Sequence, residues 1–383
     1  MRIQQTILGK STSLTVAVNA LSALDPDLLL VFGSMDHLQA PDFTATLRAA
    51  MPRAHLLGCS TAGEISPQGV DDHSCVLTAV RFDQIRLTEA STVLADMADS
   101  FAAGERIGAA LQASDLKAVL VFGPGVGING SALVDGIAAQ VGSAIPITGG
   151  LAGDGGAFQR TLTLGSAGIS EQTIVALGLA GEALCFGHGS FGGWAPFGPA
   201  RKVTRCKGNV LYELDGEPAL AVYKRYLGEH AQGLPATGLL FPFAMLGADQ
   251  NAVGLIRTIM AVDEAEGSLT LAGEITLNGS LKLMHASTDS LVDGAEAAAQ
   301  AAWDMARQSG DSLAILVSCV GRKLVMGARV DEEIEAVADV LGARATITGF
   351  YSYGEISPFI PSASCKLHNQ TMTITCLSER TVL

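Results

Sequence analysis

Two glutamates, Glu64 and Glu355, lie in nearly identical glycine-rich segments at opposite ends of the chain. The first segment reads Gly58-Cys59-Ser60-Thr61-Ala62-Gly63-Glu64-Ile65-Ser66-Pro67, and the second reads Gly349-Phe350-Tyr351-Ser352-Tyr353-Gly354-Glu355-Ile356-Ser357-Pro358. Paired carboxylates can bind a cationic group of a ligand, or transfer a proton when burial raises one pKa. Alternatively, each carboxylate accepts hydrogen bonds from amides of its own loop, because a duplication copies a structural brace equally well.

The side chains between the shared residues differ in the two segments. Ser60 and Thr61 correspond to Tyr351 and Ser352, as expected where two loops line an asymmetric pocket. A single arginine, Arg322, ends the segment Ser318-Cys319-Val320-Gly321-Arg322 and suits a carboxylate or phosphate ligand. Alternatively, it forms a salt bridge with Glu355 or with a helix acid. The predicted ligand-binding residues are Ser60, Thr61, Glu64, Arg322, Tyr351, Tyr353 and Glu355.

Catalytic chemistry is less well supported by the sequence. Cys59 could be a loop nucleophile, but its counterpart is Phe350, which favours a small apolar filler. The run from Gly123 to Gly130 contains the Gly-x-Gly-x-x-Gly spacing of dinucleotide sites, but no acid follows the next strand, where a ribose ligand belongs. A loop with a helix N-cap at Asn129 or Ser131 is favoured there. Hydrolase, Walker and kinase motifs are absent, so we do not expect an enzyme.

The glutamate segments end a larger repeated unit. Continuous apolar runs predict buried strands, and apolar residues at helical spacing predict the helices between them. The expected strand, helix and second strand span residues 28–32, 41–51 and 55–57 in the first copy, 118–122, 131–141 and 145–148 in a degenerate copy, and 313–317, 331–341 and 345–348 in the last. The fold class is therefore α/β, with two related halves built from repeated β-α-β-β units and mixed sheets covered by helices. Glycine, proline and polar residues are more frequent between residues 192 and 217, which indicates a domain boundary. We therefore predict domains of residues 1–215 and 216–383.

The overall charge excludes several partners. The 383-residue chain has a formal net charge of −14, so neither a nucleic acid nor an anionic membrane surface is an expected partner. The seven cysteines form no Cys-x-x-Cys pair, and the histidines lack zinc-site spacing. The first residues lack the apolar segment of a signal peptide, and no run of about 18 apolar residues is free of charges. We therefore expect a cytoplasmic protein with reduced thiols.

The segments around Gly58 and Gly349, together with residues 209–219 and 318–322, resemble those of proteins with FIST N-terminal and FIST C-terminal domains. The similarity extends over nearly the whole chain. It implies an intracellular sensory protein of bacterial signal transduction that binds a small ligand. One branch of this family binds haem, senses nitric oxide and regulates a histidine kinase, so haem is a possible cofactor and such a kinase a possible partner.

His188 is the candidate axial ligand for that haem. It lies in the segment 185–197, where four aromatic residues gather in a chain that has few. A haem requires an axial base within an apolar, aromatic wall. The alternative, a glycine-rich hairpin whose aromatics simply pack, is favoured. The sequence thus predicts a small-ligand sensor that is either a haem-based nitric oxide sensor or a haem-free binder of an amino-acid-like metabolite; an enzyme using Cys59 or the two glutamates is the third alternative.

Overall fold

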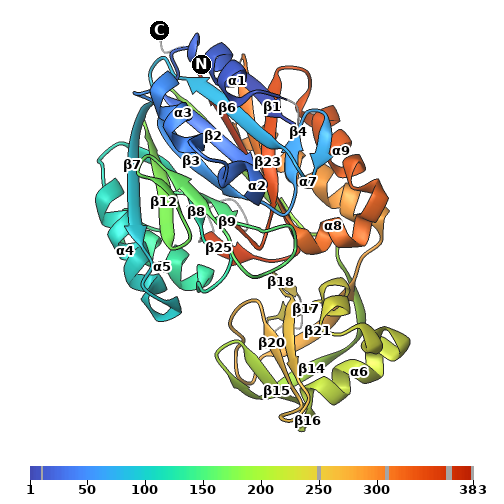
Figure 1. The fold of residues 1–383 in the computed structure, drawn as a ribbon. Helices are drawn as coiled ribbons and strands as arrows, with labels where there is room; N and C mark the ends of the chain where they lie inside the picture. The colour runs from blue at the N-terminus through green and yellow to red at the C-terminus, as the bar shows by residue number, and fades with distance from the viewer. Residues whose placement is uncertain (10–11, 248–251, 307–309, 359–364, 381–383) are drawn as a thin grey trace.

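The computed structural model describes residues 1–9, 12–247, 252–306, 310–358 and 365–380. These residues form a body of three similar units and a domain inserted into the third unit (Figure 1). Unit 1 comprises residues 1–81, unit 2 residues 86–180, and unit 3 residues 184–191 and 288–380. The inserted domain comprises residues 195–285 and lies below the body in Figure 1.

Each unit follows the same order of strand, helix, strand, helix, strand, hairpin and strand. In unit 1 these elements are β1 (Arg2–Leu8), α1 (Leu14–Ser22), β2 (Leu28–Gly33), α3 (Phe43–Ala50), β3 (His55–Ser60), β4 (Glu64–Ser66) with β5 (Gly69–Asp71), and β6 (Cys75–Arg81). In unit 2 they are β7 (Arg86–Val93), α4 (Ser100–Leu111), β8 (Leu116–Gly123), α5 (Gly130–Val141), β9 (Ile147–Leu151), β10 (Thr163–Gly165) with β11 (Gly168–Ser170), and β12 (Thr173–Ala180). In unit 3 they are β13 (Leu184–Phe191), α7 (Thr288–Ala306), β22 (Ser312–Cys319), α9 (Asp331–Leu341), β23 (Ala345–Ser352), β24 (Gly354–Pro358) with β25 (Cys365–His368), and β26 (Met372–Glu379). Short helices α2 (Met35–Leu38) and α8 (Val320–Met326) follow β2 and β22.

The three units exchange their hairpins in a cycle. Within each unit the strand order is first, last, second and third, and the second and third strands run parallel. The hairpin between the third and last strands does not join its own sheet. Hairpin β4–β5 of unit 1 pairs with β23 of unit 3, β24–β25 of unit 3 pairs with β9 of unit 2, and β10–β11 of unit 2 pairs with β3 of unit 1. Each sheet is therefore completed by another unit.

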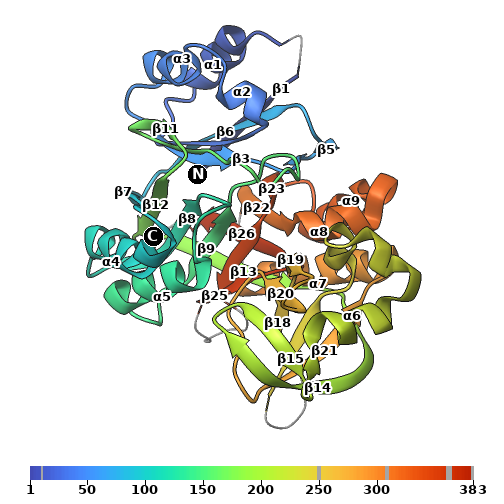
Figure 2. The ribbon, with the colours of Figure 1, turned by 60° about the horizontal axis from the view of Figure 1, so that its bottom comes forward.

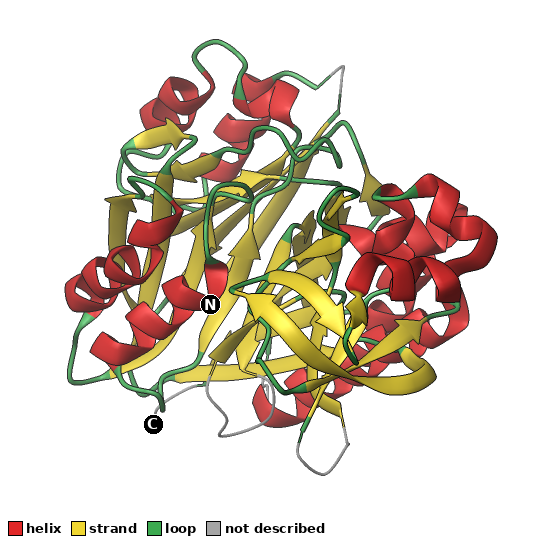
Figure 3. Ribbon diagram, turned by 90° about the horizontal axis from the view of Figure 1, so that it is seen from below, coloured by secondary structure: helices red, strands yellow, loops and turns green. Residues whose placement is uncertain are grey.

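The inner faces of the three sheets meet in a central core. Phe32, Phe122 and Phe350, one from each unit, pack there with ring centroids 4.8–5.7 Å apart. The outer faces carry the helices, which Figure 2 shows around the outside of the body and Figure 3 shows in red outside the yellow strands. Strand β2 explains the continuous apolar runs of the sequence, because Leu30 faces the central core while Leu29 faces the helices.

The inserted domain consists of a sheet, formed by strands β14 to β21, and a few helical segments, and it has its own apolar core. Its elements are β14 (Ala195–Lys207), β15 (Val210–Leu214), β16 (Glu217–Pro218), α6 (Ala219–Leu227), the short helical turns η2 (Gly228–Gly233) and η3 (Ala236–Leu240), β17 (Phe243–Leu246), β18 (Ala252–Arg257), β19 (Ile259–Asp263), β20 (Ser268–Leu271) and β21 (Ser280–His285). Helix α6 packs on this sheet through Leu220 and Tyr223. The chain enters the domain after β13 and returns to the body at α7, so both connecting segments lie on unit 3.

The predicted α/β class is confirmed, with helices and mixed sheets throughout. The predicted helix 331–341 coincides with α9, and the copy described as degenerate has the same strand order as the other two. The predicted boundary at residues 215 and 216 lies in the turn between β15 and β16, which pair with each other. Nothing in the fold tests that boundary as a division of function, and it stays a prediction.

Candidate functional site

The carboxylate of Glu64 is buried in a set of hydrogen bonds on β4. It accepts hydrogen bonds from the Thr61 hydroxyl and from the backbone N–H and hydroxyl of Ser74, at 2.9 and 3.0 Å. Glu355 on β24 repeats the arrangement, accepting from the Ser352 hydroxyl at 2.8 Å and from the N–H and hydroxyl of Thr371 at 3.1 and 3.0 Å. Each glutamate therefore joins the start of its hairpin to the start of the following strand. This is a structural brace, but its backbone donors are Ser74 and Thr371, not the amides of the glutamate's own loop that the alternative predicted.

Unit 2 has Thr163 in place of the glutamate that units 1 and 3 carry. Glu64 pairs with the residue after Gly349, Glu355 with the residue after Gly149, and Thr163 with the residue after Gly58. A comparison of the repeats by sequence does not align this threonine with the glutamates. Thr163 comes fourteen positions after Gly149, whereas each glutamate comes six positions after the equivalent glycine of its unit. The extra residues of unit 2 form a loop over positions 154–161.

Tyr353 fixes this loop on the body. Its hydroxyl accepts hydrogen bonds from the backbone N–H groups of Asp154, Gly156 and Phe158, at 3.0–3.2 Å, and donates to the Asp154 carboxylate. Its ring stacks on Phe158, with centroids 4.0 Å apart. Ser60 acts nearby by donating to the carbonyl of Gly153 at 2.6 Å. Both predicted residues thus position the loop.

Arg322 lies on α8 in a fully buried cluster. Its guanidinium donates to the Glu333 carboxylate of α9 at 2.7 Å, which also accepts from the hydroxyls of Tyr351 and Ser318. The same guanidinium donates to the carbonyls of Gly192 and Leu291, at 2.5 and 2.8 Å. Gly192 lies in the segment that leads into the inserted domain, and Leu291 lies near the start of α7, where the chain has returned to the body, so the arginine holds both ends of the insertion. Arg322 therefore forms the salt bridge that the sequence offered as an alternative to ligand binding. Its partner is the helix acid Glu333, not Glu355.

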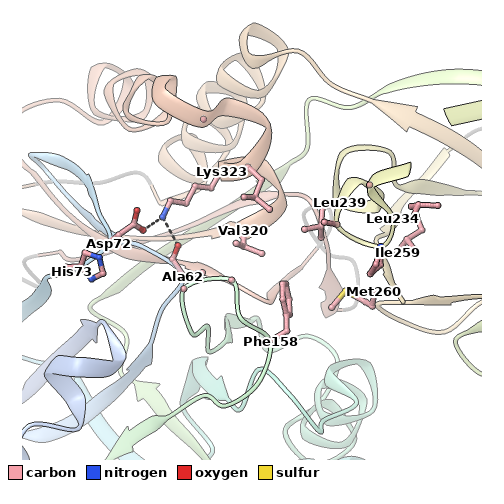
Figure 4. Close-up of a pocket in the computed structure, with 17 residues that line it drawn as sticks. Ala62, Asp72, His73, Phe158, Leu234, Leu239, Ile259, Met260, Val320 and Lys323 are labelled. Carbon is pink, nitrogen blue, oxygen red and sulfur yellow. Dashed lines mark hydrogen bonds and ion pairs between the residues drawn. The ribbon is translucent and has the colours of Figure 1, made fainter. Parts of the chain in front are cut away.

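The predicted residues surround a cavity without forming its wall. This junction cavity has a volume of about 880 Å³ and lies where all three units meet the inserted domain. Figure 4 shows Lys323, Asp72 and His73 at one end, and Leu239 and Met260 of the inserted domain at the other. The lining residues are Ala62, Asp72, His73, Gly155, Gly156, Phe158, Gly233, Leu234, Pro235, Ala236, Leu239, Ile259, Met260, Val320, Lys323, Leu324 and Gly327.

The hydrogen-bond partners of the two glutamates lie next, along the chain, to residues that line the cavity or contact its lining. Ser74, which binds Glu64, directly follows Asp72 and His73. Thr371, which binds Glu355, follows Gln370, whose amide donates to the carbonyl of Leu239 at 2.8 Å. One brace therefore positions the polar end of the cavity, and the other supports its contact with the inserted domain.

A second, smaller cavity of about 340 Å³ adjoins the first. It is lined by the glycine-rich run from Gly125 to Gly130, by Tyr353 and by residues of the inserted domain, and it shares Phe158 and Met260 with the junction cavity. Within the run, the Asn129 side chain accepts a hydrogen bond from the N–H of Ala132 at 3.1 Å, which confirms the predicted N-cap.

The pKa of each glutamate is raised to about 7, because burial disfavours the charged form more than its hydrogen bonds favour it. A raised folded-state pKa stabilises the fold below the ordinary value of 4.5, and this contribution is lost as the pH rises through 7. In the Glu64→Gln variant, the side chain at position 64 is an amide and does not titrate. We therefore expect the free energy of unfolding of the wild type, relative to this variant, to fall by about 2 kcal/mol between pH 5 and pH 8.

Urea unfolding at a series of pH values measures this difference. His188 and His368, whose pKa values burial lowers to about 4, titrate in both proteins, so their effect cancels in the comparison. Glu355→Gln is expected to give the same trend. Glu264→Gln, which removes an exposed carboxylate, is the control. A difference between wild type and Glu64→Gln that stays constant with pH would contradict the prediction.

His188 does not lie in a site that fits a haem. It is 7% exposed on β13, where its ring is tilted against Phe186 with centroids 6.3 Å apart, and it lines none of the cavities described above. Its neighbours Gly187 and Gly189 pack against the backbone of α7 so closely that an added Cβ would lie 2.1 and 2.0 Å from carbonyl oxygens. Since residues 187 and 189 face α7, the His188 side chain points to the other face of β13, where it lies next to Phe186. The packed hairpin of the alternative is not found either, because β13 pairs with β26, and Phe191 and Phe197 are 47% and 41% exposed.

Cys59 is fully buried in the central core, and this burial raises the pKa of its thiol well above the usual range. This is the environment of an inert, structural cysteine. Among the residues that the structure describes, no group of three His, Cys, Asp or Glu side chains could hold a metal ion. No helix in the described part of the chain is long and apolar enough to cross a membrane.

The residues of the cavity wall carried little signal in the sequence. Phe158 lies in the loop that only unit 2 has, so a three-way comparison of the repeats could have found it. Lys323 directly follows Arg322, but its role depends on the direction in which α8 points. Asp72, His73 and the contributions of the inserted domain have no recognisable motif, because they meet only in the folded chain.

A cavity of this size, mainly apolar with a few polar groups at one end, is typical of a protein that binds small molecules. The chain belongs to the FIST family, since the FIST N domain matches residues 27–217 and the FIST C domain matches residues 219–358. FIST domains are sensory domains of signal transduction that bind small ligands.

The chain is also similar to part of one curated protein and, in fold only, to one solved structure. An uncharacterized protein of Methanocaldococcus jannaschii is 35% identical over 92 residues, which are 23% of this chain and 17% of that protein's length. The crystal structure of a cyanuric acid hydrolase from A. caulinodans aligns over 99% of both chains, with 10% identity and a TM-score of 0.37.

Proposed function

We propose that the protein is a sensor whose small ligand binds, without haem, in the junction cavity. The observation that carries this proposal is the composition of the cavity wall, to which all three units and the inserted domain contribute. A ligand there would contact both parts of the molecule. It would favour the arrangement of body and inserted domain to which it binds best, and a partner could respond to that arrangement. The histidine kinase implied by the resemblance stays a prediction.

Several observations support binding over catalysis or haem chemistry. The two glutamates are occupied as braces, and the thiol of Cys59 faces the central core. His188 is buried and lines neither of the two cavities, so the nitric-oxide branch of the family is not the version that we propose. An amino-acid-like metabolite or another small organic molecule is the expected ligand.

A thermal-shift screen against a library of small metabolites tests the proposal. A ligand that binds only the folded protein raises its melting temperature by a few degrees when present at about 100 times its Kd. Ala236 is an exposed residue of the inserted domain that lines the cavity, so Ala236→Trp fills the site without disturbing the core. We expect compounds that stabilise the wild type to have no effect on this variant.

The matched control is Ala265→Trp, at an exposed position of the same domain outside the cavity wall. It should respond to ligands as the wild type does. If Ala236→Trp responds equally well, the ligand binds elsewhere and the proposed site is wrong. A Soret band in haem-reconstituted protein that is lost in His188→Ala would favour the haem-based alternative instead.

A further inference from the structure

Lys323 is the cation of the junction cavity, and it is held firmly in place. Its ammonium group donates to the carbonyl of Ala62 at 2.8 Å and to the Asp72 carboxylate, and it lies 5.5 Å from the ring centroid of Tyr351. Gly63 makes this approach possible, because a Cβ at that position would lie 2.6 Å from the lysine nitrogen. A lysine ammonium has three N–H donors, and these contacts use two of them. The described part of the chain offers the third no acceptor, so it is available to a ligand.

The carboxylate partner of Lys323 is replaceable. The side chain of Asp72 is 60% exposed, whereas that of Lys323 is 17% exposed. An ion pair with an exposed carboxylate contributes little, because water competes for both charges. An anion bound inside the cavity is contacted by less water, so it forms a stronger, charge-assisted hydrogen bond with the lysine. Asp72 is the single acid in the cavity wall described here, so little else repels a negative charge.

The opposite end of the cavity is apolar. Leu239, Ile259 and Met260 of the inserted domain face Phe158 and Val320 of the body across it (Figure 4). A small inorganic anion could use only the lysine end. A molecule that fills about 880 Å³ must also bury an apolar part against these side chains.

We propose that the ligand is an organic anion, with its anionic group on Lys323 in competition with Asp72 and its apolar body between Phe158 and the inserted domain. This inference rests on the proposed function, because it names the ligand class of the same cavity. His73, beside Asp72 at the rim, is placed to contact the same anionic group.

Two fluorescent probes that differ by one charge test this inference. 8-Anilinonaphthalene-1-sulfonate carries a sulfonate, and N-phenyl-1-naphthylamine has the same aromatic parts without it. Lys323→Met is expected to weaken binding of the sulfonate about tenfold and to leave the neutral probe nearly unchanged. Asp72→Asn removes the competing carboxylate and is expected to tighten binding of the sulfonate a few-fold. Fluorescence titration gives both affinities.

The outcomes separate this inference from the proposed site. If Ala236→Trp leaves both probes bound, the cavity itself is wrong. If Ala236→Trp abolishes both while Lys323→Met and Asp72→Asn change the two probes equally, only the anionic class is overturned. Melting temperatures are measured first; should Lys323→Met fail to fold, the exposed Asp72→Asn decides, and an unchanged sulfonate affinity then refutes the inference.

Discussion

Gly58→Ala is expected to prevent the protein from folding. A Cβ at Gly58 would lie 1.9 Å from the carbonyl oxygen of Val31, its neighbour on the parallel strand β2. That atom belongs to the backbone, so the clash can be relieved only by separating the two strands. Glycine within a strand often marks such a close approach. The cost should exceed about 4 kcal/mol, a large part of the total stability of a typical domain.

The other two units have the same requirement. A Cβ at Gly149 or at Gly349 would also lie 1.9 Å from a carbonyl oxygen of the adjacent parallel strand. Gly149→Ala and Gly349→Ala should therefore behave like Gly58→Ala in soluble yield and in circular dichroism melts. Gly9→Ala is the control, since no atom of the described residues lies within 4 Å of a Cβ there. The explanation fails if the three variants melt within a few degrees of this control.

Arg322→Met is expected to lower the free energy of unfolding by about 3–5 kcal/mol, because it leaves the Glu333 carboxylate buried and without its cation. Both side chains of this ion pair are 0% exposed. The variant also leaves the carbonyls of Gly192 and Leu291 without their donor, so we expect the connections of the inserted domain to loosen. Urea unfolding measures the first effect, and limited proteolysis between residues 192 and 291 measures the second.

The double variant Arg322→Met with Glu333→Gln is expected to recover part of the lost stability, because it removes the unpaired charge. Arg225→Met is the matched control. It breaks a pair with Glu217 of similar length, 2.6 Å, in which both side chains are about half exposed. We expect this control to cost less than about 1 kcal/mol. Equal costs for the two arginines would mean that Arg322 does not depend on its buried partner.

Local patterns predicted much of the body. Strand β2 and helix α9 are readable because apolar residues follow one another in the strand and recur at helical spacing in the helix. The exchange of hairpins is not readable. Each hairpin begins with a short strand such as Glu64–Ser66, and nothing within three residues indicates that its partner lies near residue 350.

The same exchange explains what the sequence could say about the site. The repeat correctly identified Glu64 and Glu355 as equivalent residues, and their brace role was one of the two alternatives. The direction in which the two glutamate side chains point could not be predicted, because it depends on the sheet that each hairpin joins. The cavity wall escaped prediction because Phe158, Lys323 and Met260 come from three separate parts of the fold.

The exchanged hairpins also determine when, during synthesis, the body can assemble. Hairpin β4–β5 leaves the ribosome early, but its partner strand β23 begins only at Ala345. The sheet of unit 2 is completed later still, by β25, which ends at His368. Pairings so distant along the chain form slowly, and a chain that still lacks its last strands exposes unpaired edges. We therefore expect the three sheets of the body to be completed only after strand β26, Met372–Glu379, has been synthesised.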